Sequence, residues 1–518
     1  MTEPRSDAGL GLTTSSWLAI AAIFAAGLWL QLTYPTTTDV SWFFVVGEKV
    51  LAGERLYVDI LEINPPMSLY LYLPAVLLEH ITGVAAEFTQ IGLMLGLVAG
   101  SMALAAAIMA ASGRRAEVGR FLVAAAFVLV VQPMLTFSQR EHIATIAALP
   151  FVMLMVARAG GHRVPIGYVI LAGLGGGLAA AIKPHFAVAL ILPALYAAVS
   201  RHSWRPLLGL EAWIAVVVVV AYAGFLVLAY PVYFDTILPI AVDTYRQARV
   251  PILDLLANRP VIAMLLIGVS VPLVGGAEGR SAKAVVPLLA ALGFFVAFLE
   301  QAKGWPYHLY PALALVYLTF LVTCLPRLAE AVAGKGLDRV TRYGRLVIGC
   351  VAIAGLAGTI GFLKYNSAQS LPLVPVIEKL APKPTLLAIS HDPSVGQPLA
   401  RLVGGTWVGS APFQWIAAAA TARLAASGID AETRARMQRL IGRDLAILAT
   451  DIRSKRPDVI LLDRARLDVD GLLAESPELA VLLGQYRTVG QANGVDLLLR
   501  QDLAAGNARI VGAAGVAP

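Results

Sequence analysis

The chain has 518 residues, of which 58% are hydrophobic and only 14% are charged. Soluble globular proteins have roughly 25% charged residues, so this chain has too few polar side chains to cover a water-soluble surface. The composition therefore excludes a soluble globular protein and indicates an integral membrane protein with many spans. The net charge of +7 is typical of the lysine and arginine excess that orients membrane helices. No nucleic-acid motif or zinc-type cysteine spacing occurs, so no nucleic-acid partner is expected.

The first apolar run covers residues 17–34. No small-residue cleavage site follows it, because the chain continues as Gln31-Leu32-Thr33-Tyr34-Pro35. We therefore expect an uncleaved first span and not a removed signal peptide. A polar loop over 35–87 comes next. Within this loop, residues 67–82 are apolar but too short to span, and we expect them to form a helix lying on the membrane surface.

A helix needs about 20 apolar residues to cross the hydrocarbon core, and by this measure the sequence predicts about eleven transmembrane helices. Every turn assigned to the cytoplasm is basic, as the distribution of lysine and arginine in membrane proteins requires. Cys324 and Cys350 fall in or beside late spans, so we expect no structural disulfide. The predicted spans are 17–34, 88–111, 121–136, 143–157, 164–182, 186–200, 207–230, 261–274, 284–299, 309–325 and 346–363.

After Lys364 the long apolar runs stop and charged residues return. Short apolar runs indicate buried strands at 385–390, 458–463, 487–489 and 494–500. Helical spacing appears over 413–426 and 433–453. These elements predict a small α/β domain of roughly 130 residues outside the membrane, large enough for its own core. We thus expect a transmembrane domain over 1–363, with a first outer loop over 35–87, an extracytoplasmic domain over 364–518, and a loose tail from about Ala504.

The turns predicted to face outward combine acids, bases, histidines and aromatic residues. Helix orientation requires basic residues inside and gives no reason for Lys183 or Lys303 outside, at the mouths of apolar helices. Ionisable groups near a bilayer are costly and indicate function. Each one alone is also compatible with snorkelling or ordinary interfacial pairing, but their gathering on one face favours a site. The predicted outward set is Asp39, Asp59, Glu62, Arg140, Glu141, His142, Lys183, His185, Asp243, Tyr245, Arg246, Arg249, Lys303, Tyr307 and His308.

Carboxylates and cations at an outer membrane face suit chemistry on a lipid-borne phosphate. Lysine and arginine neutralise phosphate oxygens, and cations stabilise the charge that builds on a departing phosphate. A carboxylate can remove the proton from an attacking hydroxyl. No glycine-rich phosphate loop is present, and no nucleotide is expected outside. The residues predicted to bind the donor phosphate are Lys183, Lys303, Arg246 and Arg140.

Asp39 is the predicted catalytic base. It follows the first span within five residues, in a threonine-rich turn, and Trp42 lies shortly after it. The alternative is that Asp39 is the N-cap of a helix over 40–52, because aspartate before an apolar run is a good cap. The two uses are compatible with each other.

The remaining candidates are predicted to contact the substrate, and each has a structural alternative. Acids and amides before Pro65-Pro66 also suit turn formation. Histidines could bind metal or sugar, but a single histidine is often a satisfied interfacial residue. Aromatic side chains could stack on a sugar or belong to the aromatic belt. The predicted substrate-binding residues are Asp59, Glu62, Asn64, His142, His185, Trp305, Tyr307 and His308.

Three sequence segments carry a resemblance to a known family. They are Gly53-Glu54-Arg55-Leu56-Tyr57-Val58-Asp59, Asn64-Pro65-Pro66 and Lys303-Gly304-Trp305-Pro306-Tyr307-His308. With a first span and an early acid before them, they resemble the GT-C membrane glycosyltransferases. The nearest members are bacterial relatives of the protein O-mannosyltransferases and the lipid A aminoarabinose transferases. The resemblance covers residues 17–363.

The resemblance implies inverting transfer of a sugar from a polyprenyl-phosphate carrier, on the periplasmic face of the bacterial inner membrane. The acceptor would be a hydroxyl of a cell-envelope glycan, lipid or protein. An aspartate in the first outer loop would act as base or acceptor-orienting group, and here that residue is Asp39. Many members also have a soluble C-terminal domain, which matches the chain from Lys364 onward.

The sequence departs from the family pattern in one respect. Many members have two acids within three residues, whereas this chain reads Asp39-Val40-Ser41. The departure puts a bound divalent metal ion in doubt, and Asp59 or Glu62 is a hypothetical second acid. Two other function classes remain open. A transporter or flippase would use broken helices or repeats near the midplane, and we see no repeat. A non-catalytic scaffold would act through the domain after Lys364.

Overall fold

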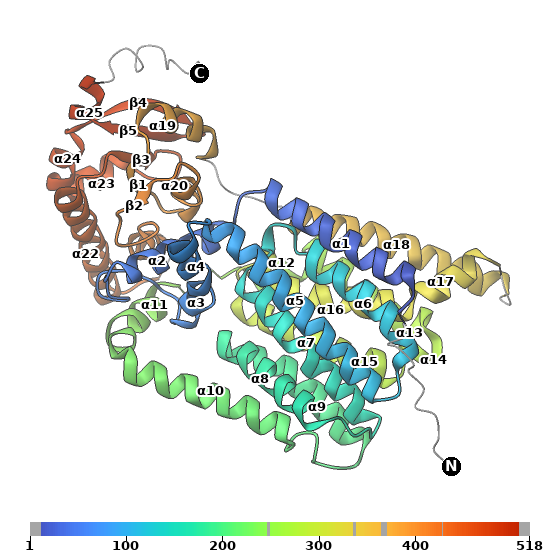
Figure 1. Cartoon of the computed structure of the whole chain (residues 1–518). Coiled ribbons are helices and arrows are strands. Elements are labelled where there is room, and N and C mark those ends of the chain that lie inside the picture. Colours follow the sequence, from blue (N-terminus) through green and yellow to red (C-terminus); the bar gives the residue numbers. More distant parts are fainter. Residues whose placement is uncertain (1–11, 246–248, 335–337, 364–369, 427, 507–518) are drawn as a thin grey trace. The chain divides into compact units, whose positions relative to one another are not determined.

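The computed structural model describes residues 12–245, 249–334, 338–363, 370–426 and 428–506. The chain is mostly helical and contains one sheet (Figure 1). It divides into two compact units, which we describe separately. The membrane unit comprises Met1–Tyr34, Phe88–Phe225 and Arg249–Tyr365, and the sheet unit comprises Pro35–Glu87, Leu226–Ala248 and Asn366–Pro518. The first outer loop therefore shares a compact unit with the C-terminal sheet.

Helical structure is present at each of the eleven predicted spans, so the chain is a polytopic helical membrane protein, as expected. Among the described residues, seven helices are long and apolar enough to cross a membrane, and others are shorter apolar helices. The helices at the predicted spans are α1 (Thr14–Thr33), α5 (Ala86–Ala111), α6 (Val118–Ala126), α7 (Arg140–Ala159), α8 (Ile166–Ile182), α9 (Val188–Ser200), α10 (Leu210–Ala229), α13 (Arg259–Val274), α15 (Ala282–Gln301), α16 (Pro306–Thr323) and α18 (Arg339–Leu363). Short helices connect them: η1 (Arg115–Glu117), η4 (Pro184–Ala187), α12 (Ile252–Leu256), α14 (Gly276–Gly279) and α17 (Leu325–Val332).

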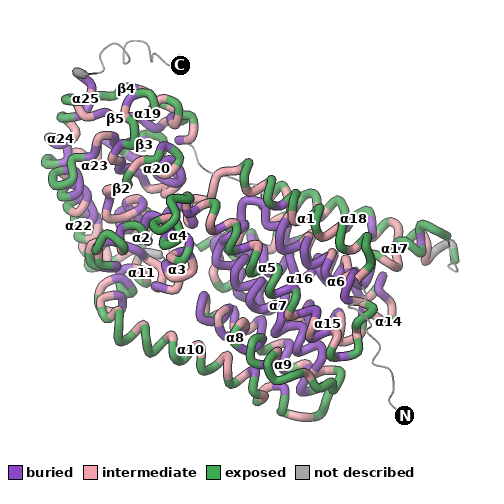
Figure 2. The backbone as a smooth tube through the Cα atoms, viewed as in Figure 1, coloured by how far each residue is buried: buried purple, intermediate pink, exposed green. Residues whose placement is uncertain are grey.

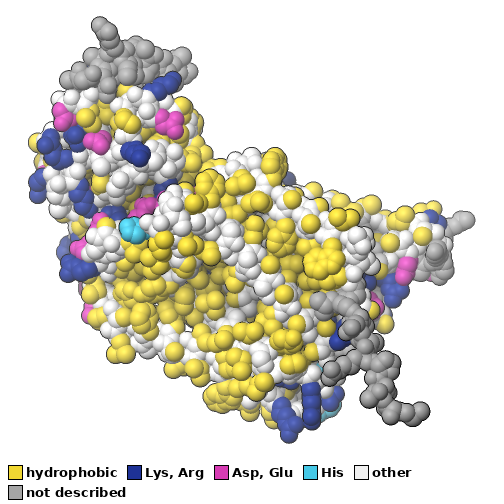
Figure 3. All heavy atoms as spheres, viewed as in Figure 1, with side chains coloured by type: hydrophobic (Ala, Val, Ile, Leu, Met, Phe, Trp, Pro, Cys, Tyr) yellow, Lys and Arg dark blue, Asp and Glu magenta, His cyan; other side chains and the backbone are white. Residues whose placement is uncertain are grey.

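Helix α7 is the centre of the membrane unit. Its residues are buried from Arg140 to Ala157, and it packs against α8, α9, α15 and α16 (Figure 2). A Cβ atom at Gly175 of α8 would lie 2.3 Å from the carbonyl oxygen of Ala147. Only glycine therefore allows α8 to approach α7 this closely, as small residues do in membrane helix pairs. Hydrophobic side chains cover most of the visible helical surface, as contact with lipid requires (Figure 3).

The span predicted at 121–136 is broken and is not one straight helix. Helix α6 ends at Ala126, a π-helical turn η2 (Phe127–Val131) follows, and a 3₁₀ turn η3 (Met134–Thr136) precedes α7. Side chains bind the carbonyl groups of the π-turn. Tyr310 Oη donates to the Val128 carbonyl at 2.7 Å, and the Leu129 carbonyl lies 2.8 Å from His142 Nε2. Irregular backbone in a membrane protein is tolerated where the surrounding protein satisfies it in this way.

The sheet unit contains a five-stranded sheet in the order β2-β1-β3-β5-β4. Strand β1 is parallel to β2 and β3, whereas β5 is antiparallel to both β3 and β4. The α/β domain expected after the last span is confirmed, and only the two-residue strand β2 was not predicted. The strands are β1 (Thr385–Ile389), β2 (Thr406–Trp407), β3 (Val459–Asp463), β4 (Tyr486–Ala492) and β5 (Val495–Arg500).

Helices α21 and α22 close the apolar core of this sheet. Leu387, Ile460 and Leu498 of the strands share one buried cluster with Leu445 and Leu448 of α22. Helix α25 extends to Gly506, so helix reaches into the predicted loose tail, and residues 507–518 lie outside the described part. The helical elements here are η7 (Leu371–Leu373), α19 (Val374–Leu380), η8 (Pro393–Val395), α20 (Leu399–Leu402), α21 (Trp415–Leu424), α22 (Ala431–Lys455), α23 (Val469–Glu475), α24 (Pro477–Leu483) and α25 (Gln501–Gly506).

The first outer loop supplies helices to the same unit. They are α2 (Thr38–Leu51), α3 (Met67–Tyr70) and α4 (Leu73–Thr82), and η5 (Tyr233–Ile237) and α11 (Leu238–Tyr245) join from the later segment. The surface helix predicted over 67–82 is thus two helices. Tyr72 separates them and stacks on Phe43 of α2, with ring centroids 5.3 Å apart.

Candidate functional site

The membrane unit gathers buried and half-buried polar side chains where four helices begin or end. Glu141 is the second residue of α7, Lys183 is the C-cap of α8, Gln301 ends α15, and His308 lies in the first turn of α16. Lys183 Nζ lies 2.5 Å from Glu141 Oε1 and 2.6 Å from Gln301 Oε1. His308 Nε2 lies 3.4 Å from the same ammonium nitrogen. We call these four residues the Lys183 cluster.

The Lys183 cluster has polar atoms that its own residues do not use. Glu141 is 0% exposed and its Oε2 atom has no hydrogen-bond partner within the described residues, and the same holds for Nδ1 of His308. Leaving such a buried atom unpaired costs about 1–3 kcal/mol. Exceptions of this kind call for an explanation, and an unbound polar ligand is one.

A second layer of charged and aromatic side chains lies beside the cluster. Glu300 Oε2 lies 3.6 Å from His185 Nδ1, and Glu300 Oε1 lies 3.3 Å from the guanidinium of Arg249. Lys303 is buried with its ammonium nitrogen 5.9 Å from the centroid of the Trp305 ring. Burial, and then the charge of Arg249, lower the pKa of Lys303 to about 8. Lys303 can therefore keep its charge at neutral pH while remaining poorly hydrated, which favours binding of an anion.

The structure brings most of the predicted phosphate-binding and histidine residues together. His308 is within electrostatic reach of Arg140, Lys183, His185 and Lys303. The rings of Trp305 and Tyr307 have centroids 5.2 Å and 4.6 Å from that of His308. Arg246, the other predicted phosphate ligand, lies outside the described residues. The three neighbouring cations outnumber Glu141, so the local charge is positive and suits an anionic group.

His142 has a structural position. It is 0% exposed, and its Nδ1 atom accepts a hydrogen bond from the Ser138 backbone N–H at 3.0 Å. Its Nε2 atom is 2.8 Å from the Leu129 carbonyl. Because both ring nitrogens are engaged with the backbone, His142 fixes the break before α7 and has no ring nitrogen left for a sugar or a metal.

Asp39 belongs to the sheet unit and lies in the first turn of α2, half-buried. The alternative reading of Asp39 as an N-cap is wrong, because α2 begins at Thr38 and its N-cap is Thr37. The sequence argument placed the helix start two residues too late, since threonine and aspartate are both common before a helix. A carboxylate in the first turn is favoured in its ionised form by the helix dipole.

Glu62 and Asn64 hold the loop against α2. Glu62 is buried, and its Oε2 accepts from Trp42 Nε1 at 2.5 Å. Its Oε1 accepts from the backbone N–H and the side-chain Nδ2 of Asn64, at 2.7 and 2.6 Å. The Asn64 carbonyl accepts from Tyr57 Oη at 2.7 Å. These contacts favour the turn-forming alternative for Glu62 and Asn64. They also tie the loop to Trp42, which lies three residues after Asp39 on α2.

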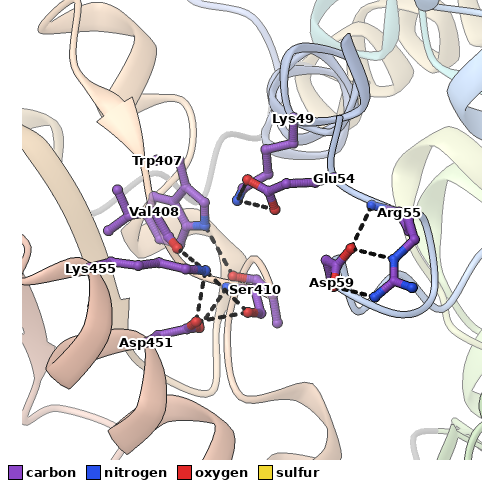
Figure 4. Close-up of polar contacts among 10 residues, drawn as sticks. Lys49, Glu54, Arg55, Asp59, Trp407, Val408, Ser410, Asp451 and Lys455 are labelled. Atoms are coloured by element: carbon purple, nitrogen blue, oxygen red, sulfur yellow. Dashed lines mark hydrogen bonds and ion pairs between the residues drawn. The ribbon is translucent and has the colours of Figure 1, made fainter. Parts of the chain in front are cut away.

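Figure 4 shows two groups of polar contacts in the sheet unit, one within the first loop around Arg55 and Asp59 and one within the C-terminal part around Ser410 and Asp451. Asp59 Oδ2 accepts from the backbone N–H and from Nε of Arg55, both at 2.9 Å, and these bonds lower the pKa of Asp59 to about 2. Asp451 accepts from the backbone and hydroxyl of Ser410, at 2.7 and 2.8 Å. A backbone hydrogen bond links the two groups, since the Ser410 carbonyl accepts from the Leu61 N–H at 2.7 Å. Because both of its contacts are with Arg55, four residues earlier, Asp59 is part of a turn.

Within the described residues, no group of three or more His, Cys, Asp or Glu side chains is arranged to hold a metal ion. Asp39-Val40-Ser41 has only one acid, and Asp59 and Glu62 are engaged as described above. These residues do not fit a divalent ion held by protein carboxylates alone.

Sequence reasoning missed Glu141 and Gln301 as members of the cluster. The sequence predicts both residues in outward turns and assigns neither of them to the site. The available signal was position. Both lie at the ends of apolar helices, beside residues that were selected, and an uncompensated Lys183 at that depth requires a partner.

Comparisons with known proteins show which solved structures have a similar fold. No protein-family model matches the chain, and no curated protein sequence matches it. Among solved structures, ArnT from Cupriavidus metallidurans in the apo state matches with a TM-score of 0.53 and 13% identity, over 93% of this chain and 98% of that chain. ArnT bound to undecaprenyl phosphate matches with a TM-score of 0.54 and 13% identity, over 94% and 98%. The resemblance to the GT-C membrane glycosyltransferases is thereby confirmed at the level of the fold.

Proposed function

We propose that this chain is a membrane glycosyltransferase that moves a sugar from a polyprenyl-phosphate carrier to an acceptor hydroxyl. Two observations support the proposal. The fold is that of ArnT, which has been solved with undecaprenyl phosphate bound. The membrane unit also holds the Lys183 cluster, whose polar atoms are only partly used, and the neighbouring cations Arg140 and Lys303 make the local charge positive. A transporter reading has no comparable feature in its favour.

The proposed chemistry assigns separate tasks to the cations and to Asp39. Lys183, Lys303 and Arg140 bind the phosphate of the carrier and stabilise the negative charge that grows on it as it leaves. Asp39 accepts the proton of the acceptor hydroxyl. The bond between the anomeric carbon and the phosphate oxygen breaks while the acceptor oxygen bonds the same carbon from the opposite face. The products are an inverted glycoside, the carrier phosphate and a protonated Asp39.

The histidine and aromatic residues beside the cluster are assigned to the sugar. Trp305 and Tyr307 have aromatic rings of the kind that stack on sugars, and His185 and His308 each have a buried ring nitrogen with no hydrogen-bond partner among the described residues. We propose that the reaction occurs on the periplasmic face of a bacterial inner membrane. The acceptor is then a hydroxyl of a cell-envelope glycan, lipid or protein.

The Lys183 cluster is the observation that carries the proposal, and binding of undecaprenyl phosphate tests it. The full chain in detergent is titrated with undecaprenyl phosphate, and intrinsic tryptophan fluorescence or native mass spectrometry reports the complex. Lys183→Met should weaken binding about 10-fold or more, because a charge-assisted hydrogen bond contributes about 1.5–3 kcal/mol. Lys283→Met is the matched control, since Lys283 also pairs with a glutamate, Glu117, and lies in the first turn of α15 whereas Gln301 ends that helix. Equal affinity of the wild type and Lys183→Met would contradict the assignment.

A second experiment tests the base. Turnover is measured as release of undecaprenyl phosphate from undecaprenyl-phosphate-linked pentoses and hexoses, with water or an added alcohol as acceptor. Asp39→Asn should reduce turnover by at least about 100-fold, in line with the 10²–10⁴-fold contribution of a general base. Binding of undecaprenyl phosphate should remain unchanged. Full turnover by Asp39→Asn would remove Asp39 from the mechanism.

A further inference from the structure

One buried glutamine of the C-terminal part contacts the helix that carries Asp39. Gln397 follows η8 in the connection between β1 and β2, and it is 0% exposed. Its Oε1 atom accepts a hydrogen bond from Ser41 Oγ at 2.8 Å. Its backbone carbonyl accepts from Thr38 Oγ1 at 3.3 Å. Both partners lie in the first turn of α2, more than 300 residues earlier in the chain.

These two hydrogen bonds bracket Asp39. Thr38 and Ser41 are three residues apart, so they share one face of α2. Asp39 lies between them in sequence and about 100° further round the helix, by the 3.6-residue repeat. Gln397 therefore does not need to touch the carboxylate to fix its direction. The two hydrogen bonds from Thr38 and Ser41 therefore tie the first turn of α2 to Gln397.

The rest of α2 is held by the same part of the chain. The ring of Trp42 meets that of Trp407 edge-on, with centroids 6.5 Å apart. Further along, Glu48 pairs with Arg401. Gln397 contacts the first turn, Trp407 the middle and Arg401 the later part of the helix. Precise placement of a reacting group requires support of this sort from the surrounding shell.

The unused end of the Gln397 amide shows that it is more than structural filling. Its Nε2 atom is buried and has no hydrogen-bond partner in the described part of the chain. An apolar side chain would fill the same space without that cost of about 1–3 kcal/mol. Each buried unpaired group in a native protein calls for an explanation, and a functional role is one such explanation. In Gln397 the atom that makes a hydrogen bond is Oε1, which accepts from Ser41 Oγ.

We propose that Gln397 is a positioning residue for Asp39, so that the C-terminal sheet domain forms part of the catalytic machinery. This inference rests on the proposed function, in which Asp39 is the base. It predicts that losing the Gln397 bond to Ser41 displaces the carboxylate from the acceptor without affecting the donor. A misplacement of about 1 Å can cost about 100-fold in rate.

The test compares full-length variants in the turnover assay with an undecaprenyl-phosphate-linked sugar as donor. Gln397→Ala and Ser41→Ala should each lower kcat by about 10-fold to 100-fold while the donor KM stays within about twofold, because catalysis and not donor binding is lost. The double variant should lose no more than the larger single loss, since both changes remove the same bond. Gln397→Glu should restore kcat to within about threefold of the wild type, because it keeps the acceptor atom for Ser41. Gln491→Ala is the control, since Gln491 lies on β4 and bonds Asp496.

The outcomes separate this inference from the function on which it rests. If Asp39→Asn is inactive but Gln397→Ala keeps the wild-type kcat, the positioning role is refuted and the base assignment stands. Additive losses in the Ser41→Ala and Gln397→Ala pair, or a parallel rise in donor KM, would likewise refute it and leave a general folding defect as the explanation. If Asp39→Asn is fully active, the base assignment itself fails.

Discussion

Removing the charge of Arg401 is a direct test of how the sheet unit holds the first loop. The Arg401 guanidinium is 9% exposed and pairs with three carboxylates. Glu48 comes from α2 and Glu79 from α4, whereas Glu87 lies in the first turn of α5. Nε is 2.5 Å from Glu87 Oε1, and Nη2 is 3.0 Å from Glu79 Oε2. The guanidinium carbon also lies 5.3 Å from the centre of the Phe44 ring. Arg401→Met leaves three acids facing one another.

The magnitude follows from burial. Breaking a buried ion pair by removing one partner costs about 3–5 kcal/mol. The carboxylates here are partly hydrated, with side-chain exposures of 43%, 30% and 25% for Glu48, Glu79 and Glu87. Solvent screening therefore reduces the cost, and we expect about 2–4 kcal/mol. Burial already raises the pKa of Glu48 in the intact cluster, so one acid is predisposed to protonate once Arg401 is gone.

The assay is native-state hydrogen exchange of the full chain in detergent, read at the amides of α2 and α4. At pH 8, Arg401→Met should lower the free energy of opening by about 2–4 kcal/mol. The loss should shrink towards pH 5, because burial holds the folded-state pKa of Glu48 above its unfolded value and Arg401 no longer opposes this. A raised carboxyl pKa gives stability that is present at low pH and is lost as the pH increases through it. Arg487→Met, at an exposed position on β4, is the control. Unchanged exchange at pH 8, or a loss that does not depend on pH, would refute the reasoning.

Further predictions concern Asp444, Trp42 and Glu141. Burial raises the pKa of Asp444 to about 7, so the stability that Asp444 contributes below its unfolded pKa is lost as the pH rises towards 7. Asp444→Asn should therefore flatten the fall in Tm between pH 5 and pH 8. An unchanged dependence of Tm on pH would contradict this prediction. Trp42→Phe removes the donor to Glu62 and should speed proteolysis of the loop at 52–64 without changing undecaprenyl phosphate affinity. Glu141→Gln removes the negative charge beside Lys183, so undecaprenyl phosphate should bind about 3-fold more tightly or better. Turnover should nevertheless fall, because Lys183 loses the carboxylate that orients it. Weaker binding would count against an anion site.

Much of the architecture could be predicted because it depends on local composition. Apolar runs near the length of a bilayer crossing determine where helices must form, and basic turns orient them. The strands at 459–463 and 495–500 were visible as short apolar runs with turn residues on either side. Lys183, Lys303 and His308 were also found by sequence reasoning, because a charged or polar residue at the end of an apolar helix is unusual whatever its partners are.

The tertiary structure decided the partners and the breaks. The π-turn before α7 could not be predicted, since it depends on Tyr310 and His142 reaching carbonyl groups from other helices. Likewise, Glu62 and Asp59 looked like candidate acids until Trp42, Asn64 and Arg55 were seen to occupy them. Nothing near Asp39 in the sequence indicates Gln397, because a hydrogen bond between residues 41 and 397 exists only once the chain has folded. Composition thus determined which segments enter the membrane, whereas the charge and hydrogen-bond partners of each polar side chain depend on distances that only folding sets.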